Sequence, residues 1–137
     1  MQIRANGTFD VKMTPQGWAE SQPEAAKTLG RFLIDKQIHG DLEATTQGQM
    51  LACCDGKPSS SGAYVAIERV TGTLHGRSGS FALCHVGLIA QGAPELTIKV
   101  VPGSGTDELH GIAGEFRIKR DEGKHSYEFD YTLTTEQ

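Results

Sequence analysis

In several segments apolar and polar residues alternate, and a few polar residues stand at positions where an apolar one is expected. These polar residues are the candidates for binding or catalysis. Arg69 has the phase of Val65 and Ile67, and His85 and Tyr127 continue apolar stripes in later segments. Alternate side chains of a strand point to the same face, so these three are expected to face an interior. An isolated buried charge is costly unless it is paired or solvated. Arg69 and His85 near one mouth of a barrel would therefore line a water-accessible pocket that binds an anion.

Glu68 offers a second kind of chemistry, which depends on the face of the strand that it occupies. It alternates with Arg69 and shares its phase with Tyr64 and Ala66. A bulge near Gly72 would exchange the two faces, because one extra residue flips every side chain beyond it. The sequence therefore leaves open whether Glu68 or Arg69 faces inward. A strand-end position with its head in solvent is the simpler interpretation of Arg69.

Two glycine-rich stretches, residues 72–80 and 101–106, resemble phosphate loops in composition only. A phosphate loop needs a helix N-terminus to supply aligned amides, whereas strands are expected after both stretches. Arg77 and Ser104 stay as rim positions that could bind a small anion. The acidic pair and histidine within residues 107–110 make a weak ligand set, because adjacent strand side chains diverge. No metal or cofactor is expected.

Period-two alternation runs through most of the chain and predicts the elements that hold these residues. About eight strands are expected, over residues 3–13, 29–38, 41–54, 63–71, 78–88, 95–101, 108–119 and 124–134. Residues 14–26 contain two prolines and a glycine and are expected to form a loop with one short helical turn. The sequence Asp121-Glu122-Gly123 predicts a hairpin turn.

These segments predict an all-β fold, a single antiparallel eight-stranded barrel that forms one domain over residues 1–137. Most connections are short, as antiparallel neighbours allow. The 17 glycines favour tight curvature, because bulges and barrel corners need a residue without Cβ. Eight strands also leave an interior large enough for side chains or one small ligand. A two-sheet sandwich is the competing architecture, since alternation alone does not separate the two.

Charge and cysteine usage restrict the partners and the compartment. The chain has Lys+Arg 13 against Asp+Glu 17, a net charge of -4, which argues against a nucleic-acid partner. Its start lacks the pattern of a signal peptide, and no stretch approaches the ~20 apolar residues of a membrane helix. Three cysteines, an odd number, fit a reducing cytoplasm. We therefore expect a cytoplasmic protein with no nucleic-acid or membrane partner.

Several sequence blocks together resemble an uncharacterised bacterial family, the domain-of-unknown-function 3224 family. The blocks span nearly the whole chain and are Tyr64–Leu74, Gly76–Phe81, Val101–Thr106 with Leu109–Ile112, and His125–Tyr127 with Asp130 and Tyr131. The resemblance implies an eight-stranded barrel similar to that of allene oxide cyclase. It implies no established activity. The catalytic motif of the cyclases has no residue-by-residue match here, so their reaction is not transferred.

Two functions of an interior site remain open, and so does the question whether the chain is an enzyme. The leading hypothesis is that the barrel binds a small, partly apolar or anionic ligand through Arg69, His85 and Tyr127, with Glu68 and Arg77 as further candidates. The alternative is a cofactor-free isomerase, cyclase or hydrolase. Glu68 or His85 would then be the general acid or base, and Arg69 would stabilise developing negative charge.

A third function is assembly without a small-molecule ligand. The strand phase that holds Tyr64 and Ala66 is itself partly apolar, so that face could form the interface of a homo-oligomer such as a dimer. For each histidine, a structural hydrogen-bonded role is the simpler interpretation.

Overall fold

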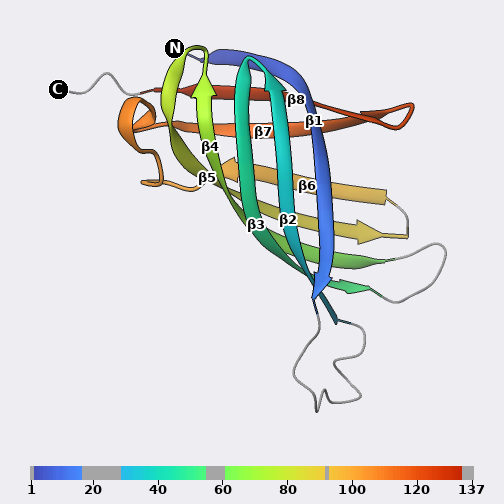
Figure 1. The fold of residues 1–137 in the computed structure, drawn as a ribbon. Helices are drawn as coiled ribbons and strands as arrows, with labels where there is room; N and C mark the ends of the chain where they lie inside the picture. Colours follow the sequence, from blue (N-terminus) through green and yellow to red (C-terminus); the bar gives the residue numbers. More distant parts are fainter. Residues whose placement is uncertain (1, 17–28, 55–60, 92, 134–137) are drawn as a thin grey trace.

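The computed structural model describes residues 2–16, 29–54, 61–91 and 93–133, whose eight antiparallel strands close into one barrel (Figure 1). Each strand pairs with its neighbours in the sequence, and β1 pairs with β8 to close the ring. The strands are β1 (Ile3–Gln16), β2 (Leu29–Gly40), β3 (Leu42–Cys54), β4 (Gly62–Leu74), β5 (Arg77–Ala90), β6 (Ala93–Val100), β7 (Ala113–Asp121) and β8 (Lys124–Thr132). The predicted barrel is confirmed, and a two-sheet sandwich is excluded.

The two ends of the barrel differ. At one end, here called the packed end, the β2–β3 and β4–β5 hairpins meet the connection between β6 and β7. That connection contains the 3-10 turn η2 (Asp107–Leu109), and it buries Leu109 and Ile112 against the barrel core. The β5–β6 and β7–β8 turns lie at the other end, here called the mouth (Figure 1).

Aromatic side chains fill the packed half of the barrel. Phe116 stacks on Tyr127 with ring centroids 5.1 Å apart, and Phe81 stacks on Phe129 at 5.6 Å. Such pairs add specific contacts to the large apolar area that each ring buries. The buried core comprises Ala5, Phe9, Ile38, Leu42, Ala44, Val70, Leu74, Phe81, Leu83, Ile98, Val100, Leu109, Ile112, Phe116, Tyr127, Phe129 and Tyr131.

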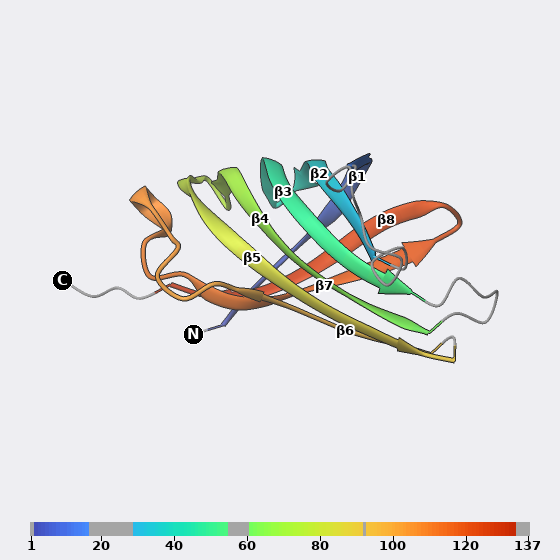
Figure 2. The same cartoon turned by 90° about the horizontal axis from the view of Figure 1, so that it is seen from below.

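Toward the mouth, the strands are not paired along their whole length. β6 and β7 share a single register pair, Lys99 with Glu115, and their ribbons diverge beyond it (Figures 1 and 2). β8 pairs with β1 only over Ile3–Phe9. Pro15 in β1 and Pro94 in β6 lie on these free edges, which tolerate a residue that has no N–H. β1 can therefore continue through Pro15, although the sequence predicted a loop from residue 14.

Other sequence predictions have mixed outcomes. The predicted strand over residues 108–119 is instead η2 followed by β7, which begins at Ala113. The β7–β8 turn is confirmed, with Glu122 and Gly123 at φ of 49° and 79°. No bulge exchanges the faces of β4, because its register runs unbroken through Gly72. The predicted helical turn after residue 16 lies outside the described residues. No helix in the described ranges is long and apolar enough to cross a membrane.

Candidate functional site

Three ionisable side chains meet inside the barrel: Lys36 from β2, Glu68 from β4 and His85 from β5. The Lys36 ammonium donates to Glu68 Oε1 at 2.9 Å, and His85 Nε2 lies 2.5 Å from the same oxygen. The three residues are only 6%, 1% and 4% exposed. Buried charges persist only when they are paired, so each member of this Lys36–Glu68–His85 cluster depends on the others.

The register of β3 allows the cluster to form across an intervening strand. Gly48 of β3 lies opposite Glu68, and Thr46 lies opposite Lys36. A Cβ at position 48 would lie 2.3 Å from the Ile67 carbonyl oxygen and 2.6 Å from Glu68 Cα. Because Gly48 has no side chain, Glu68 reaches over β3 to Lys36 on the strand beyond it.

Glu68 is ionised in spite of its burial. Burial alone would raise the pKa of the carboxyl, but the hydrogen bond from His85 and the charge of Lys36 outweigh it and lower the pKa of Glu68 to about 2. Two polar atoms at the cluster, Glu68 Oε2 and the hydroxyl oxygen of the neighbouring Thr46, are buried with no hydrogen-bond partner in the described part of the chain. Buried polar atoms are normally bonded, so both have spare bonding capacity.

A cavity of about 190 Å³ lies beside this cluster, and Lys36 and His85 line it. Most of its wall is apolar, and no aspartate or glutamate is among its described lining residues. The remaining lining residues are Phe9, Val11, Met13, Ile34, Met50, Tyr64, Ala66, Ile118, Arg120 and His125. The ionisable groups at the wall are thus mostly bases, which makes the cavity suited to a negatively charged group.

Phe9 positions two of these bases. The Lys36 Nζ lies 5.0 Å from the centroid of the Phe9 ring, and the His125 ring stacks on Phe9 at 5.0 Å. A cation over an aromatic face is attracted by the ring quadrupole. Phe9 therefore holds Lys36 and His125 at the same wall of the cavity.

The cavity adjoins the gap between β6 and β7. A second pocket of about 340 Å³ there shares Tyr64, Ile118 and Arg120 with the first. Burial raises the pKa of Tyr64, and the charge of Arg120 acts in the opposite direction. The Tyr64 hydroxyl is therefore a protonated hydrogen-bond donor at neutral pH. The unpaired seam between β6 and β7 gives the interior a side opening next to a cation and this donor.

The structure separates the two residues whose faces the sequence left open. Glu68 faces the interior, whereas Arg69 is exposed on the outer face, where it donates to Ser80 Oγ at 3.0 Å. The prediction that Arg69 shares an interior phase with its apolar neighbours is wrong. Val65 and Ile67 are themselves 49% and 54% exposed, so the outer face of β4 is the more apolar one at these positions.

The other predicted residues are scattered. His85 faces the interior, as expected. Tyr127 is also inside but belongs to the packed half, where its hydroxyl accepts the Leu42 N–H at 3.1 Å and donates to the His39 carbonyl at 3.0 Å. Arg77 is exposed at the β4–β5 hairpin, and Ser104 bonds the backbone of the packed end. Neither Arg77 nor Ser104 lines the cavity.

The sequence prediction omits Lys36 and Arg120. Lys36 lies between Ile34 and Ile38 on the inward phase of β2, so the phase test that selected His85 applies equally to it. Arg120 ends the inward phase of β7 and lines the cavity, and it is also exposed, as the predicted solvated strand end implies. The predicted oligomer face is also wrong, because Tyr64 and Ala66 point into the barrel rather than away from it.

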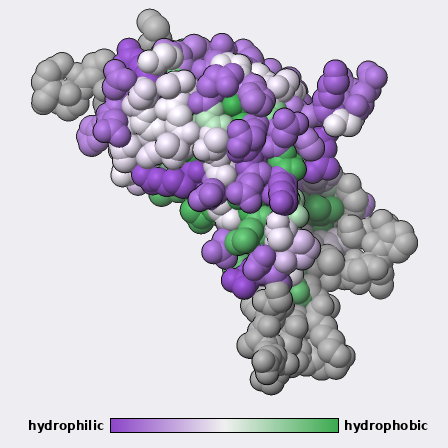
Figure 3. Space-filling view, in the orientation of Figure 1, coloured by the Kyte–Doolittle hydropathy of each residue, from purple (hydrophilic) through white to green (hydrophobic). Residues whose placement is uncertain are grey.

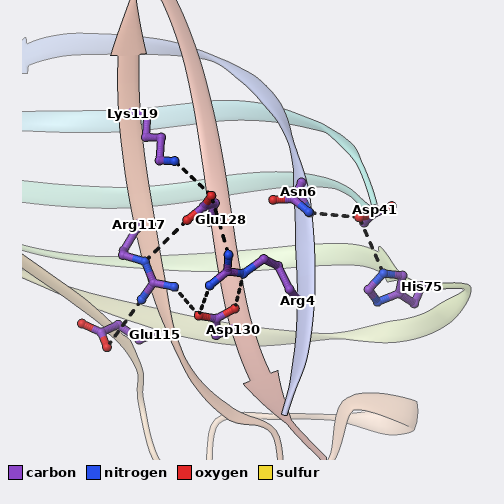
Figure 4. A network of polar contacts seen from close by, with 9 residues as sticks. All are labelled: Arg4, Asn6, Asp41, His75, Glu115, Arg117, Lys119, Glu128 and Asp130. Atoms are coloured by element: carbon purple, nitrogen blue, oxygen red, sulfur yellow. Dashed lines mark hydrogen bonds and ion pairs between the residues drawn. The ribbon is translucent and has the colours of Figure 1, made fainter.

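A second set of charges covers the outer face of β1, β7 and β8 (Figure 4). Arg4 donates to Asp130 at 2.8 and 3.0 Å, Arg117 also bonds Asp130, and Lys119 bonds Glu128 at 3.0 Å. The bonds from Arg4 and Arg117 lower the pKa of Asp130 well below its ordinary value. These charges satisfy one another, so the network ties strands together. Among the described residues, no group of histidine, cysteine and acidic side chains is arranged to hold a metal ion.

Comparison with known proteins places this barrel in a family. No curated protein matches the chain. The chain is similar to a crystal structure from Shewanella oneidensis, a protein with unknown function from the DUF3224 family. The two are 39% identical, the match covers 99% of this chain and 100% of that chain, and the TM-score is 0.89. Residues 5–131 match the family described as protein of unknown function (DUF3224). The chain therefore belongs to the DUF3224 family.

Proposed function

We propose that this DUF3224 protein binds a small amphipathic carboxylate in the cavity beside the Lys36–Glu68–His85 cluster. The observation that carries the proposal is the cavity wall, where Lys36, His85, Arg120 and His125 stand among apolar side chains. Lys36 and Arg120 are two basic side chains at the site, against the single carboxylate of Glu68. A monoanion would balance the site.

The geometry of the donors supports a carboxylate as the charged group. Lys36 uses one N–H toward Glu68, and an ammonium has three, so two remain. Arg120 presents a planar fork that matches carboxylate oxygens, and Tyr64 adds a hydroxyl. A charge-assisted bond from Lys36, which is only 6% exposed, is stronger than the same bond at a surface, whereas Arg120 is exposed and adds less.

The volume and wall indicate a short apolar tail. About 190 Å³ is below the roughly 300–1,000 Å³ of pockets that hold drug-sized ligands. Met13 and Met50 lie in the wall, and methionine adapts to ligands of irregular shape. Each buried methylene contributes about 0.8 kcal/mol, so affinity should rise about fourfold per added carbon until the cavity is full.

Titration calorimetry with butanoate, hexanoate and octanoate, each beside its amide, tests the proposal. We expect the carboxylates to bind more tightly than the amides, with affinity rising along the series. Arg120→Gln should weaken carboxylate binding about twofold to fivefold, because Arg120 is exposed and solvent screens the charge that is lost. Arg69→Gln is the matched control, since Arg69 lies on the outer face and should leave binding unchanged. Equal binding of acids and amides, or no binding at millimolar concentration, would refute the proposal.

A separate observation favours a second property, and we also propose that two copies of the chain associate through the outer face of β3–β5. Leu51, Val65 and Val86 form one cross-strand row there, with Ile67 and Leu88 beside it. These five residues, the β4 patch, are 46–54% exposed. Hydrophobic surface also interrupts the hydrophilic exterior in the lower half of Figure 3. Monomers seldom leave large apolar patches uncovered.

A second copy is the occupant that suits this face. A two-fold dimer places the same patch on both partners, so apolar rows meet apolar rows. The residues of the β4 patch carry no charge, whereas the whole chain has a net charge of -4 and repels its copy elsewhere.

A further inference from the structure

His85 is held in an orientation typical of a general base. Its Nε2 lies 2.5 Å from Glu68 Oε1, and no residue in the described ranges hydrogen-bonds its Nδ1. The ring lines the cavity. A carboxylate that accepts the Nε2 proton selects the tautomer in which Nδ1 has a lone pair, and it stabilises the imidazolium that forms when Nδ1 takes a proton.

Lys36 is placed to stabilise negative charge next to this base. Its ammonium contacts the same oxygen of Glu68 that His85 contacts, at 2.9 Å, so the two groups are neighbours at the cavity wall. Preformed donors aimed at developing negative charge are among the largest contributions to catalysis. Base and cation thus stand side by side, and Glu68 fixes both.

We propose that the cavity catalyses proton transfer at the carbon next to a carbonyl group, with His85 as the base and Lys36 as the donor to the enolate oxygen. The substrate class is a short oxo acid. This inference rests on the proposed function, because the acid must first bind in the cavity. Arg120, on the β7–β8 hairpin, would hold the carboxylate while His85 and Lys36 act on the carbonyl end.

The step balances without a co-reactant. His85 Nδ1 takes the proton, the C–H electron pair becomes the C=C bond, and the carbonyl pair moves to the oxygen that Lys36 stabilises. The imidazolium then returns the proton. Return to the same carbon gives exchange with no net change, and return to the γ-carbon of a β,γ-unsaturated substrate gives its conjugated isomer. Nothing is oxidised or reduced, and no bond to the protein forms.

Proton exchange in D₂O tests the proposal, with 4-oxopentanoate as the probe and ¹H NMR to follow the loss of its C3 signal. We expect the wild-type protein to accelerate exchange over buffer. His85→Gln should reduce that acceleration about 100-fold, the usual size of general-base catalysis. With the Arg69→Gln variant, whose substitution lies on the outer face of β4, the probe should exchange at the same rate as with the wild-type protein. Calorimetry on the same samples measures binding of the probe separately.

Glu68 is a positioning residue in this scheme, and ¹⁵N NMR of the His85 ring tests its role. The wild-type protein should show a protonated Nε2 and a bare Nδ1, and Glu68→Gln should shift this tautomer balance. Glu68→Gln should also lower the exchange rate more than the binding of the probe, while Glu68→Asp should recover part of the rate. The opposite tautomer in the wild-type protein would overturn the proposal even if no variant folds.

The outcomes separate the two proposals. If oxo acids bind but exchange no faster than in buffer or with His85→Gln, the catalytic inference fails and the proposed function stands. If butanoate and its homologues bind but 2-oxobutanoate, 2-oxohexanoate and 4-oxopentanoate do not, the inference again fails alone. If no carboxylate of either kind binds, both fail.

Discussion

At the scale of single residues, Glu68 couples the stability of the barrel to the properties of its cavity. One of its oxygens accepts from both Lys36 and His85, and the whole group is 1% exposed. Breaking a buried ion pair by removing one partner typically costs about 3–5 kcal/mol, because a charge is left unpaired. The same contacts that make the site suitable for an anion therefore also make its residues sensitive to substitution.

The lowered pKa of Glu68 predicts a specific acid response. Its pKa falls from 4.5 to about 2 in the folded protein, so the unfolded state binds more protons between these values. The stabilisation is then complete above about pH 4.5 and is lost as the pH falls toward 2. At ~1.36 kcal/mol per pKa unit, the wild-type protein should lose up to about 3 kcal/mol more than Glu68→Gln over this interval. Urea unfolding of both proteins at pH 6, 4 and 2.5 measures the difference; parallel pH curves would contradict it.

Part of this site could be predicted by looking for polar residues at strand positions that otherwise hold apolar ones. His85 continues a stripe that the structure confirms as inward-facing, and Lys36 satisfies the same criterion between two buried isoleucines. Arg69 shows where the criterion fails. Its strand carries Val65 and Ile67 on the outer face, so apolar character did not mark the interior. What joins Lys36 to Glu68 is the absence of a side chain at Gly48, and that long-range fit is not encoded in local alternation.

At the scale of elements, Gly48 is expected to control how β3 and β4 approach each other at the site. Added at this position, a Cβ would meet backbone atoms of β4 at 2.3 and 2.6 Å, and backbone cannot move aside as a side chain can. We expect Gly48→Ala to destabilise the protein by about 1–3 kcal/mol, the usual cost of overpacking, and to weaken carboxylate binding by displacing Glu68.

Thermal unfolding and calorimetry of Gly48→Ala check this expectation, with Gly30→Ala as the control. At Gly30 the nearest atom to a Cβ belongs to the movable Phe32 ring, at 3.2 Å, so that variant should be affected much less. Equal effects of the two substitutions would show that β-strand glycines act here through chain entropy alone.

The positions of the strands were the part of the fold that the sequence predicted best, because side chains of a strand alternate between the two faces of a sheet. In β8, Tyr127, Phe129 and Tyr131 all face the interior, as their spacing indicates. The errors fall where tertiary pairing changes. β1 runs through Pro15 because β8 leaves its edge free there, and the predicted strand over residues 108–119 is interrupted by η2, which plugs the packed end. Neither effect is visible in a window of local sequence.

At the scale of the whole molecule, the two faces of β3–β5 link assembly to the site. Ile67 and Val86 point outward, and their chain neighbours Glu68 and His85 point into the barrel. Strands braced by a partner on their outer face would hold the inner cluster more rigidly. β6 and β7 separate toward the mouth, whereas the mouth halves of β3, β4 and β5, which carry the β4 patch, stay paired with one another.

Self-association through the β4 patch predicts that the wild-type protein sediments as a dimer at micromolar concentration, with a melting temperature that rises with protein concentration. Ile67→Lys should give a monomer with a concentration-independent melting temperature, because it places like charges on both partners within the apolar contact. Ile3→Lys is the matched control: Ile3 is 38% exposed and lies on β1, away from the patch, so this variant should remain a dimer. A wild-type monomer in sedimentation velocity would exclude the interface. If Ile67→Lys is still a dimer, the contact lies elsewhere on the molecule. The rigidity of β3–β5 around the cavity would then come from the Lys36–Glu68–His85 cluster and not from a partner.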